Sequence, residues 1–239
     1  LKGVFTLDFG TAFNGQKVTS IMATAFPTTA RLAIYALAIE TFLGIGLGVI
    51  AGMRRGKWFD STILVFSLLL ISVPTFVLGF VLQFLLGIKL GVLPVTASVS
   101  VDFASLTMPA MVLGGVSLAY VIRLTRQSVS ENVSADYVRT ARAKGLIKRK
   151  ALTRHALRTA LIPMATYFAF ALATLFTGAA ITERVYGWHG MGEYSISAIA
   201  GMDINGVTAV VAFSGLCTLT GALLSDVFVA VVDPRVRVS

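Results

Sequence analysis

The chain has 239 residues, of which 56% are hydrophobic and only 13% charged, and its mean hydropathy is +0.84. Ordinary soluble domains contain about a quarter charged residues, so this composition excludes a soluble globular domain. The single cysteine, Cys217, cannot form a disulfide within the chain, which excludes a disulfide-stapled secreted module. The net charge of +9 acquires a meaning only from the positions of the twenty basic residues.

Five segments are uncharged, or nearly so, over the roughly 20 residues that a helix needs to cross a hydrocarbon core about 30 Å thick. They are Leu32–Met53, Thr62–Ile88, Phe103–Ile122, Thr159–Thr182 and Ile204–Ser225. Backbone amides in lipid need internal partners, and the alternation typical of barrel strands is absent, so we expect helices. Pro74 and Gly79 predict a kinked or loosened second span, which favours a multi-helix bundle. The predicted fold class is an all-α, polytopic integral membrane protein.

The basic residues are distributed unevenly between the two ends of these spans. Fifteen of the twenty lie on one side, and they are Arg54, Arg55, Lys57, Arg123, Arg126, Arg139, Arg142, Lys144, Lys148, Arg149, Lys150, Arg154, Arg158, Arg235 and Arg237. The others are Lys2, Lys17, Arg31, Lys89 and Arg184. The positive-inside rule makes the first side cytoplasmic. The high pI therefore reflects topology, and no nucleic-acid partner is needed to explain it.

This orientation divides the chain into three parts. We expect an extracytoplasmic segment, 1–30, a membrane domain, 31–233, and a cytoplasmic tail, 234–239. An N-terminus outside the membrane requires an upstream signal or span, and the first residue is Leu rather than Met. We therefore expect five visible spans and a sixth, preceding span in the full protein.

The cytoplasmic linker 126–158 has an ordered helical pattern. Ser134 is the predicted N-cap of a short helix, with Asp136 just inside it, and Gly145 is the predicted end. A second helix is expected from about Ile147 into the membrane, with Pro163 near the start of the fourth span.

Two interpretations of this linker are open from the residues alone. Tyr137, Ala141 and Lys144 share one helix face, and the small residues Ala141, Ala143 and Gly145 allow another protein's backbone to approach closely. A basic loop held by anionic lipid explains the charge equally well. Lipid attraction, however, requires no particular spacing of Ala, Gly and Pro.

Several segments together resemble one family of membrane proteins. They are FGTAFNGQKV, GVIAGMRRGKWFD, YVRTARAKGL, RHALRTALIP, ERVYGWHGMG and the terminal DPRVR. The loop resembles the EAA loop of ABC importer permeases, specifically of the dipeptide and oligopeptide permease family, and the resemblance covers nearly the whole chain. Arg139-Thr140-Ala141 stands where the general motif begins Glu-Ala-Ala, and His189 stands where the family usually has proline.

The resemblance implies a type I ABC importer permease fold, a six-span bundle in the bacterial plasma (inner) membrane. It implies as partners a second related permease in a heterodimer, two ATPase subunits or domains, and an external solute-binding protein. No cofactor or metal is expected in this chain, and ATP and Mg are expected in the ATPase subunits. Peptides are the leading solute class, while relatives of this fold carry nickel, glutathione or haem.

The resemblance also suggests functional residues. In the family the loop forms coupling helices that dock into a cleft on the ATPase. Gly145 corresponds to the motif glycine and Ala141 to one of its alanines. The residues expected at the ATPase-coupling surface are Tyr137, Arg139, Ala141, Lys144, Gly145 and Leu146. Those expected at an external gate or binding-protein contact are Glu183, Tyr186, Trp188, Gly190 and Gly192.

No sequence motif predicts an enzyme. A phosphate-binding loop needs Gly, four residues and Gly-Lys-Ser/Thr, whereas the stretch from Gly52 to Lys57 has three intervening residues and is followed by Trp58. His155 and His189 are predicted on opposite sides of the membrane, and neither a His-Glu-x-x-His pair nor a Gly-x-Ser-x-Gly elbow is present.

Glu40 lies inside the first predicted span and is a candidate pathway residue, although a buried structural carboxylate fits equally well. Gly44, Gly48 and Gly52 follow at four-residue intervals and favour close helix packing, within this subunit or against a second permease. Glu40 and Pro74 are also compatible with an ion-gradient-driven secondary transporter. That class does not require the long cytoplasmic helix-turn-helix, and the resemblance favours the ABC importer.

Overall fold

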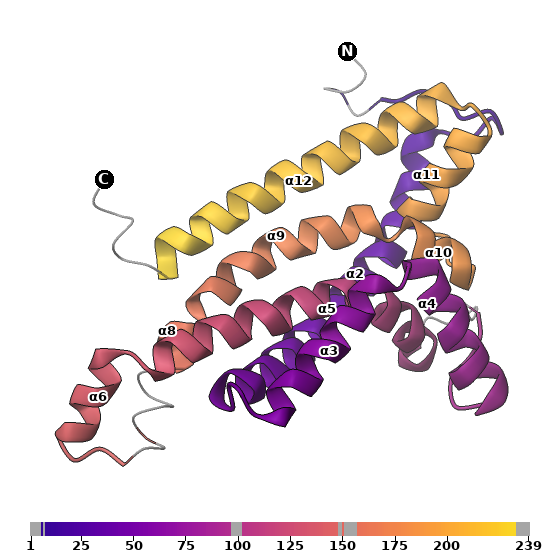
Figure 1. The fold of residues 1–239 in the computed structure, drawn as a ribbon. Helices are drawn as coiled ribbons and strands as arrows, with labels where there is room; N and C mark the ends of the chain where they lie inside the picture. Colours follow the sequence, from indigo (N-terminus) through magenta and orange to yellow (C-terminus); the bar gives the residue numbers. More distant parts are fainter. Residues whose placement is uncertain (1–5, 7, 97–101, 148–149, 151–156, 233–239) are drawn as a thin grey trace. The chain divides into compact units, whose positions relative to one another are not determined.

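The computed structural model describes residues 6, 8–96, 102–147, 150 and 157–232 (Figure 1). Helices joined by turns make up this part of the chain, which contains an isolated β-bridge between Thr11 and Lys17 but no strand. The helices are α2 (Val18–Met53), α3 (Trp58–Ser72), α4 (Thr75–Leu82), the π-helix η1 (Gln83–Lys89), α5 (Phe103–Val133), α6 (Asp136–Ala143), α8 (Arg158–Ala160), α9 (Ile162–Gly178), α10 (Ala180–Tyr186), α11 (Met191–Ala200) and α12 (Ile204–Val232).

The chain folds into two compact units. The first unit comprises Leu1–Leu37, Val73–Gly114 and Ala171–Ala222, and the second unit comprises Ala38–Ser72, Gly115–Phe170 and Leu223–Ser239. The long helices α2, α5, α9 and α12 each contribute a segment to both units. The three segments of each unit come from distant parts of the sequence, so each unit is held together by contacts between helices rather than by chain order.

The first long helix begins earlier than predicted. α2 starts at Val18, whereas the first predicted span starts at Leu32. The Thr24 hydroxyl donates to the Ser20 and Ile21 carbonyl oxygens, and Pro27 lies inside the helix. The predicted span was based on apolar content, which indicates where a helix crosses lipid and not where its backbone hydrogen bonds begin, so its bounds stay a prediction.

The second predicted span is two separate helices. α3 ends at Ser72 and α4 begins at Thr75, so the helix is interrupted at Pro74, as predicted. Proline lacks a backbone N–H and disfavours helical geometry in the residue before it. Gly79 does not loosen α4. Because Gly79 has no side chain, Val185 packs close to it in the first unit, and the Val185 Cγ1 would lie 3.1 Å from a Cβ added at Gly79. The Gly79 carbonyl oxygen accepts a hydrogen bond from the Tyr186 hydroxyl at 3.2 Å.

Three helices of the described residues are long and apolar enough to cross a membrane, namely α2, α5 and α12. The segments Trp58–Ser72 and Thr75–Lys89 add a fourth if they form one broken span. The fourth predicted span corresponds to α9, whose 17 residues extend about 25 Å and fall just short of a hydrocarbon core of about 30 Å. The total number of spans stays a prediction.

A stripe of glycines packs α2 against α5 within the second unit. A Cβ added at Gly44 would lie 2.6 Å from Val121 Cγ1, and one added at Gly48 would lie 2.5 Å from Thr125 Cβ. At Gly52 it would lie 2.8 Å from the Arg126 carbonyl oxygen. The stripe predicted from the sequence is therefore a contact within this subunit, and only glycine allows the two helices to approach this closely.

An ion pair joins α3 to α5 in the same unit. Arg126 donates from Nε to Asp60 Oδ1 at 2.5 Å and from a second guanidinium nitrogen to Asp60 Oδ2 at 2.8 Å. Asp60 Oδ2 also accepts the Gly56 amide at 2.9 Å, which fixes the turn between α2 and α3. A pair of this kind, with two parallel hydrogen bonds, fixes the relative orientation of the two side chains as well as pairing their charges.

Candidate functional site

The short helix α6 ends in a left-handed glycine, as the sequence predicts. Gly145 has φ of +88°, its amide bonds the Arg142 carbonyl at 3.0 Å, and the Leu146 amide bonds the Ala141 carbonyl at 3.2 Å. This six-to-one bond defines a Schellman cap, whose usual companion is an apolar contact across the turn. Leu146 supplies that contact by packing on the buried pair Val138 and Ala141.

The start of α6 differs from the prediction. The N-cap position belongs to Ala135, which has no capping side chain, and Asp136 occupies the first turn as expected. The Ser134 hydroxyl instead bonds the Ser130 and Glu131 carbonyls at the end of α5, at 3.2 and 3.1 Å. A serine hydroxyl can donate to the carbonyls of the preceding helix or accept from the amides of the following one, and Ser134 bonds the preceding helix.

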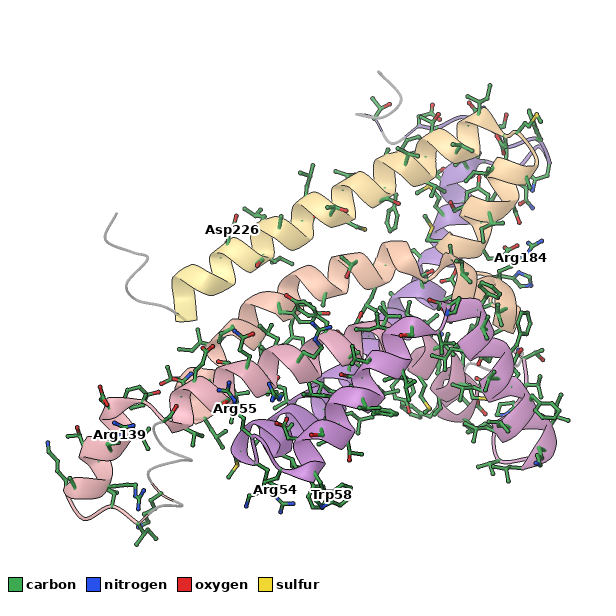
Figure 2. The ribbon with its side chains drawn as sticks, in the orientation of Figure 1. Arg54, Arg55, Trp58, Arg139, Arg184 and Asp226 are labelled. Carbon is green, nitrogen blue, oxygen red and sulfur yellow. The ribbon has the colours of Figure 1, made fainter. Side chains whose placement is uncertain are left out.

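The predicted coupling residues divide into an exposed set and a buried set. Tyr137, Arg139, Lys144 and Gly145 are exposed, whereas Ala141 is 8% exposed and Leu146 is half-buried. Of the three residues predicted on one helix face, Tyr137 and Lys144 are exposed and Ala141 is buried, and the coupling role of all three stays a prediction. Figure 2 shows Arg139 on α6 beyond the end of α5, and its ion pair with Asp136 is open to solvent.

The second helix of the predicted helix-turn-helix lies mostly outside the described residues. Residues 148–149 and 151–156, including His155, are among those not described. The chain is described again from residue 157, and α9 begins at Ile162 with Pro163 in its first turn, as predicted. Proline is favoured there because the first helical amides have no partner within the helix.

The predicted external-gate residues are brought together by the turn between α10 and α11 in the first unit. Glu183 is fully buried, and its two carboxylate oxygens accept the Thr29 hydroxyl at 2.5 Å and the Glu193 amide at 2.9 Å. Thr29 in turn accepts the Met191 amide at 2.8 Å. These amides belong to the first turn of α11, so a carboxylate from α10 caps the positive end of the next helix.

The remaining predicted residues of this turn are also enclosed. Tyr186 and Trp188 are 1% and 3% exposed. A Cβ at Gly190 would overlap the Glu183 carboxylate, and one at Gly192 would overlap the Ala180 backbone. Burial raises the pKa of Glu183, while the bonds from Thr29 and the Glu193 amide lower it, and burial dominates. These five residues form the interior of the turn and are not part of its exposed surface.

The exposed groups at this turn are different ones. Gly187 ends α10 with φ of +69°, and the Trp188 amide bonds the Glu183 carbonyl at 2.8 Å in a second Schellman cap. His189 is exposed, and Arg184, labelled in Figure 2, pairs with Glu193 at 2.9 Å.

Sequence reasoning missed Thr29. The residue lies well before the external loop in the sequence and carries no motif of its own. The only available signal was a hydroxyl in an apolar helix, which needs a partner when buried.

Glu40 is fully buried in the second unit. Within the described residues neither carboxylate oxygen accepts a hydrogen bond, although Ser117 and Tyr167 lie close to the carboxyl group. A buried carboxylate with no cation partner among the described residues is compatible with both sequence interpretations, pathway and structure. Its pathway role stays a prediction.

The described residues contain no group of three or more His, Cys, Asp or Glu side chains able to hold a metal ion. The sites described above are formed by helix packing, helix caps and buried hydrogen bonds. These features define a polytopic helical membrane protein with a short capped helix presented beyond its bundle.

The chain belongs to the family of binding-protein-dependent transport system inner membrane components, whose model matches residues 44–238. The oligopeptide transport system permease protein OppB of Mycobacterium bovis is 38% identical, with 97% of this chain and 77% of the relative covered. The dipeptide transport system permease protein DppB of Lactococcus lactis subsp. cremoris is 33% identical, with 98% and 77% covered.

Solved structures agree on the fold. The permease fold of an inward-facing MetNI methionine ABC transporter matches with a TM-score of 0.73 at 15% identity, covering 90% of this chain and 97% of that chain. An amino acid ABC transporter matches with a TM-score of 0.69 at 16% identity, covering 89% and 94%. The chain is thus a permease subunit of an ATP-driven importer in the inner membrane, not itself an ATPase, and it works with ATPase and binding-protein partners.

Proposed function

We propose that this permease imports peptides and that α6 with its Gly145 cap is the element that docks on the ATPase. The peptide assignment is supported by the relatives, which are oligopeptide and dipeptide permeases at 33–38% identity over nearly the whole chain. The docking assignment is supported by one observation above all. α6 is a short helix capped at Gly145, and its buried residues Val138 and Ala141 pack against Leu146 after the cap and against Val133 at the end of α5.

In this proposal the coupling residues have two roles. Tyr137, Arg139, Lys144 and Gly145 are exposed and contact the ATPase cleft. Ala141 and Leu146 hold the cap together, so that the motif moves as one rigid lever when ATP and Mg bind in the partner subunits. Such a motif transmits displacement to α5, because bending it away from α5 requires breaking the apolar contact that includes Val133.

The permease pairs with a second, related subunit, and an external binding protein delivers the peptide. The parts of this chain are then the outer segment 1–30, the permease domain 31–233 with its loop 126–158, and the inner tail 234–239. We propose that Glu183, Tyr186, Trp188, Gly190 and Gly192 act in the external gate by fixing the α10–α11 turn. The binding protein then contacts the exposed neighbours of these residues, among them His189 and Arg184.

The docking proposal is tested by Gly145→Arg in the complex of permeases and ATPase reconstituted in vesicles. An added Cβ at Gly145 meets nothing within 4 Å, so in the permease alone the substitution carries only the strain of its left-handed backbone, about 1–2 kcal/mol. In the complex the side chain occupies the space that the ATPase approaches. We expect peptide-stimulated ATP hydrolysis and peptide uptake to fall at least tenfold.

Two controls separate strain from docking. Gly145→Ala carries the same strain without the bulk. Gly56→Arg adds an arginine at another exposed left-handed glycine, φ +79° with nothing within 4 Å, in the turn before α3. Both controls are expected to keep most of the activity. Normal ATPase capture and wild-type uptake in Gly145→Arg would refute docking at this cap and return the loop to a lipid-bound segment.

A further inference from the structure

The second unit contains a polar pocket that transport through the permease does not explain. Its volume is about 350 Å³, and it lies between α3, α5 and the turn after α2. One face of α5 forms most of the wall, with Arg123, Arg126, Gln127, Ser130 and Glu131 spaced at one-turn intervals. Arg55 and Leu64 close it from the opposite side.

The three arginines of the pocket are engaged to different degrees. Arg126 is held by Asp60, and Arg55 donates to the Ser130 hydroxyl at 3.0 Å, which leaves part of each guanidinium unused. Arg123 is exposed and has no hydrogen-bond or ion-pair partner in the described part of the chain. The acidic side chain of the pocket, Glu131, accepts a bond from Gln127 at 3.1 Å. The wall is therefore basic, with one uncommitted cation.

The charges are ordered along α5. Arg123 follows directly on the third predicted span, which ends at Ile122, whereas Glu131 lies eight residues further on, about 12 Å along the helix axis. Leu64 lies just inside the second predicted span. Leu68, one turn deeper on the same face of α3, is 54% exposed. The uncommitted arginine thus lies at the predicted inner membrane boundary, and an apolar helix face continues from it into the hydrocarbon.

We propose that this pocket binds the phosphate of an anionic phospholipid of the cytoplasmic leaflet. The phosphate contacts Arg123 and the free guanidinium nitrogens of Arg55, and an acyl chain lies along Leu64 and Leu68. Arginine suits phosphate because its planar fork makes paired, charge-assisted bonds. Basic pockets between helices at the cytoplasmic side are the usual sites for anionic headgroups. The apolar continuation favours a lipid over a free phosphate compound, which has no tail to bury.

The test uses the purified complex of permeases and ATPase in nanodiscs, with phosphatidylglycerol as the probe. Retained lipid is counted by native mass spectrometry, and the apparent affinity is measured by titrating phosphatidylglycerol into discs of phosphatidylcholine. A bond to a charged group changes a dissociation constant about tenfold or more, so we expect Arg123→Gln to weaken the tight site about tenfold.

Arg54→Gln is the matched control. Arg54 neighbours Arg55 in the same turn but lies over the Phe59 ring, 4.7 Å from its centroid, and does not line the pocket. Figure 2 shows Arg54 beside Trp58 at the outer side of the turn and Arg55 nearer to α5. A diffuse attraction of lipid to basic residues predicts equal losses in Arg54→Gln and Arg123→Gln. The pocket predicts a loss of the retained lipid only in Arg123→Gln.

The remaining outcomes overturn the proposal. Equal competition by inorganic phosphate or glycerol phosphate would make the ligand a free phosphate compound. A loss of ATPase assembly in Arg123→Gln, with lipid retention unchanged, would make the pocket a protein interface. Equal thermal midpoints of both variants in lipid-free detergent serve as the check that folding is intact.

Discussion

The contact between α2 and α5 in the second unit allows a paired substitution on one helix. Gly48 and Gly46 are two residues apart on α2, so replacing either with alanine gives the same gain in helix propensity, about 1 kcal/mol. Their surroundings differ completely. A Cβ at Gly48 would lie 2.5 Å from Thr125 Cβ and 2.8 Å from the Ile122 carbonyl oxygen, whereas a Cβ at Gly46 meets nothing within 4 Å.

The magnitude follows from these distances. Non-bonded carbon atoms prefer separations of about 3.5–4.0 Å, so Gly48→Ala forces the two helices apart by about 1 Å. The Ile122 oxygen belongs to the backbone and cannot rotate away. Overpacking of this kind costs about 1–3 kcal/mol, and because propensity cancels, we expect Gly48→Ala to be less stable than Gly46→Ala by that amount.

Thermal unfolding of both variants, purified in the same detergent, measures the difference. We expect the Gly46→Ala midpoint at or above that of the wild type and the Gly48→Ala midpoint several degrees below it. Equal midpoints would refute the close approach of these helices, and a lower midpoint for Gly46→Ala alone would place the tight contact on the wrong face of α2.

Three further outcomes are expected. Asp60→Asn should lower stability by about 1–3 kcal/mol in the same assay, because Arg126 and the Gly56 amide lose a charged acceptor, whereas Asp136→Asn should leave it unchanged. Glu183→Gln should destabilise by about 1–3 kcal/mol, because its NH₂ group would either face the donor Glu193 amide or leave the Thr29 hydroxyl hydrogen without an acceptor, and Glu193→Gln, which keeps that amide, should not. In a Cys217→Ser background, Arg54→Cys and His189→Cys should label from opposite sides of the membrane in intact cells, and same-side labelling would contradict the predicted topology.

The two ends of α6 show which sequence signals are sufficient to predict where a helix begins and ends. Gly145 was predicted correctly because a left-handed cap needs glycine and the following Leu146 completes the apolar contact. Ser134 was assigned to the wrong helix because its hydroxyl has acceptors on one side and donors on the other, within four residues of each. Local chemistry limits such a serine to two roles, and only the geometry of the α5–α6 turn decides between them.

The external turn shows what a sequence does not contain. Glu183, Gly190 and Gly192 stood out from the family resemblance, yet the resemblance could not tell a surface from an interior. The buried position of Glu183 is explained by Thr29, a residue more than 150 positions earlier that joins Glu183 to the first turn of α11. A hydrogen bond between residues this far apart depends on the packing of whole helices, and no local pattern encodes it.

The buried network limits how a gate at this turn can operate. Swinging α11 away from α10 and α2 would break the bonds from the Glu193 amide to Glu183 and from the Met191 amide to Thr29, and each buried group left unpaired costs about 1–3 kcal/mol. The glycines add a steric condition, since Gly190 lies against the Glu183 carboxylate with no room for a side chain. Only a movement that carries the α2 segment around Thr29 together with α10, the turn and the first turn of α11 keeps every one of these contacts. If this turn forms part of the external gate proposed above, we expect it to move as one body with the α2 segment around Thr29, with hinges in the segments that flank this group.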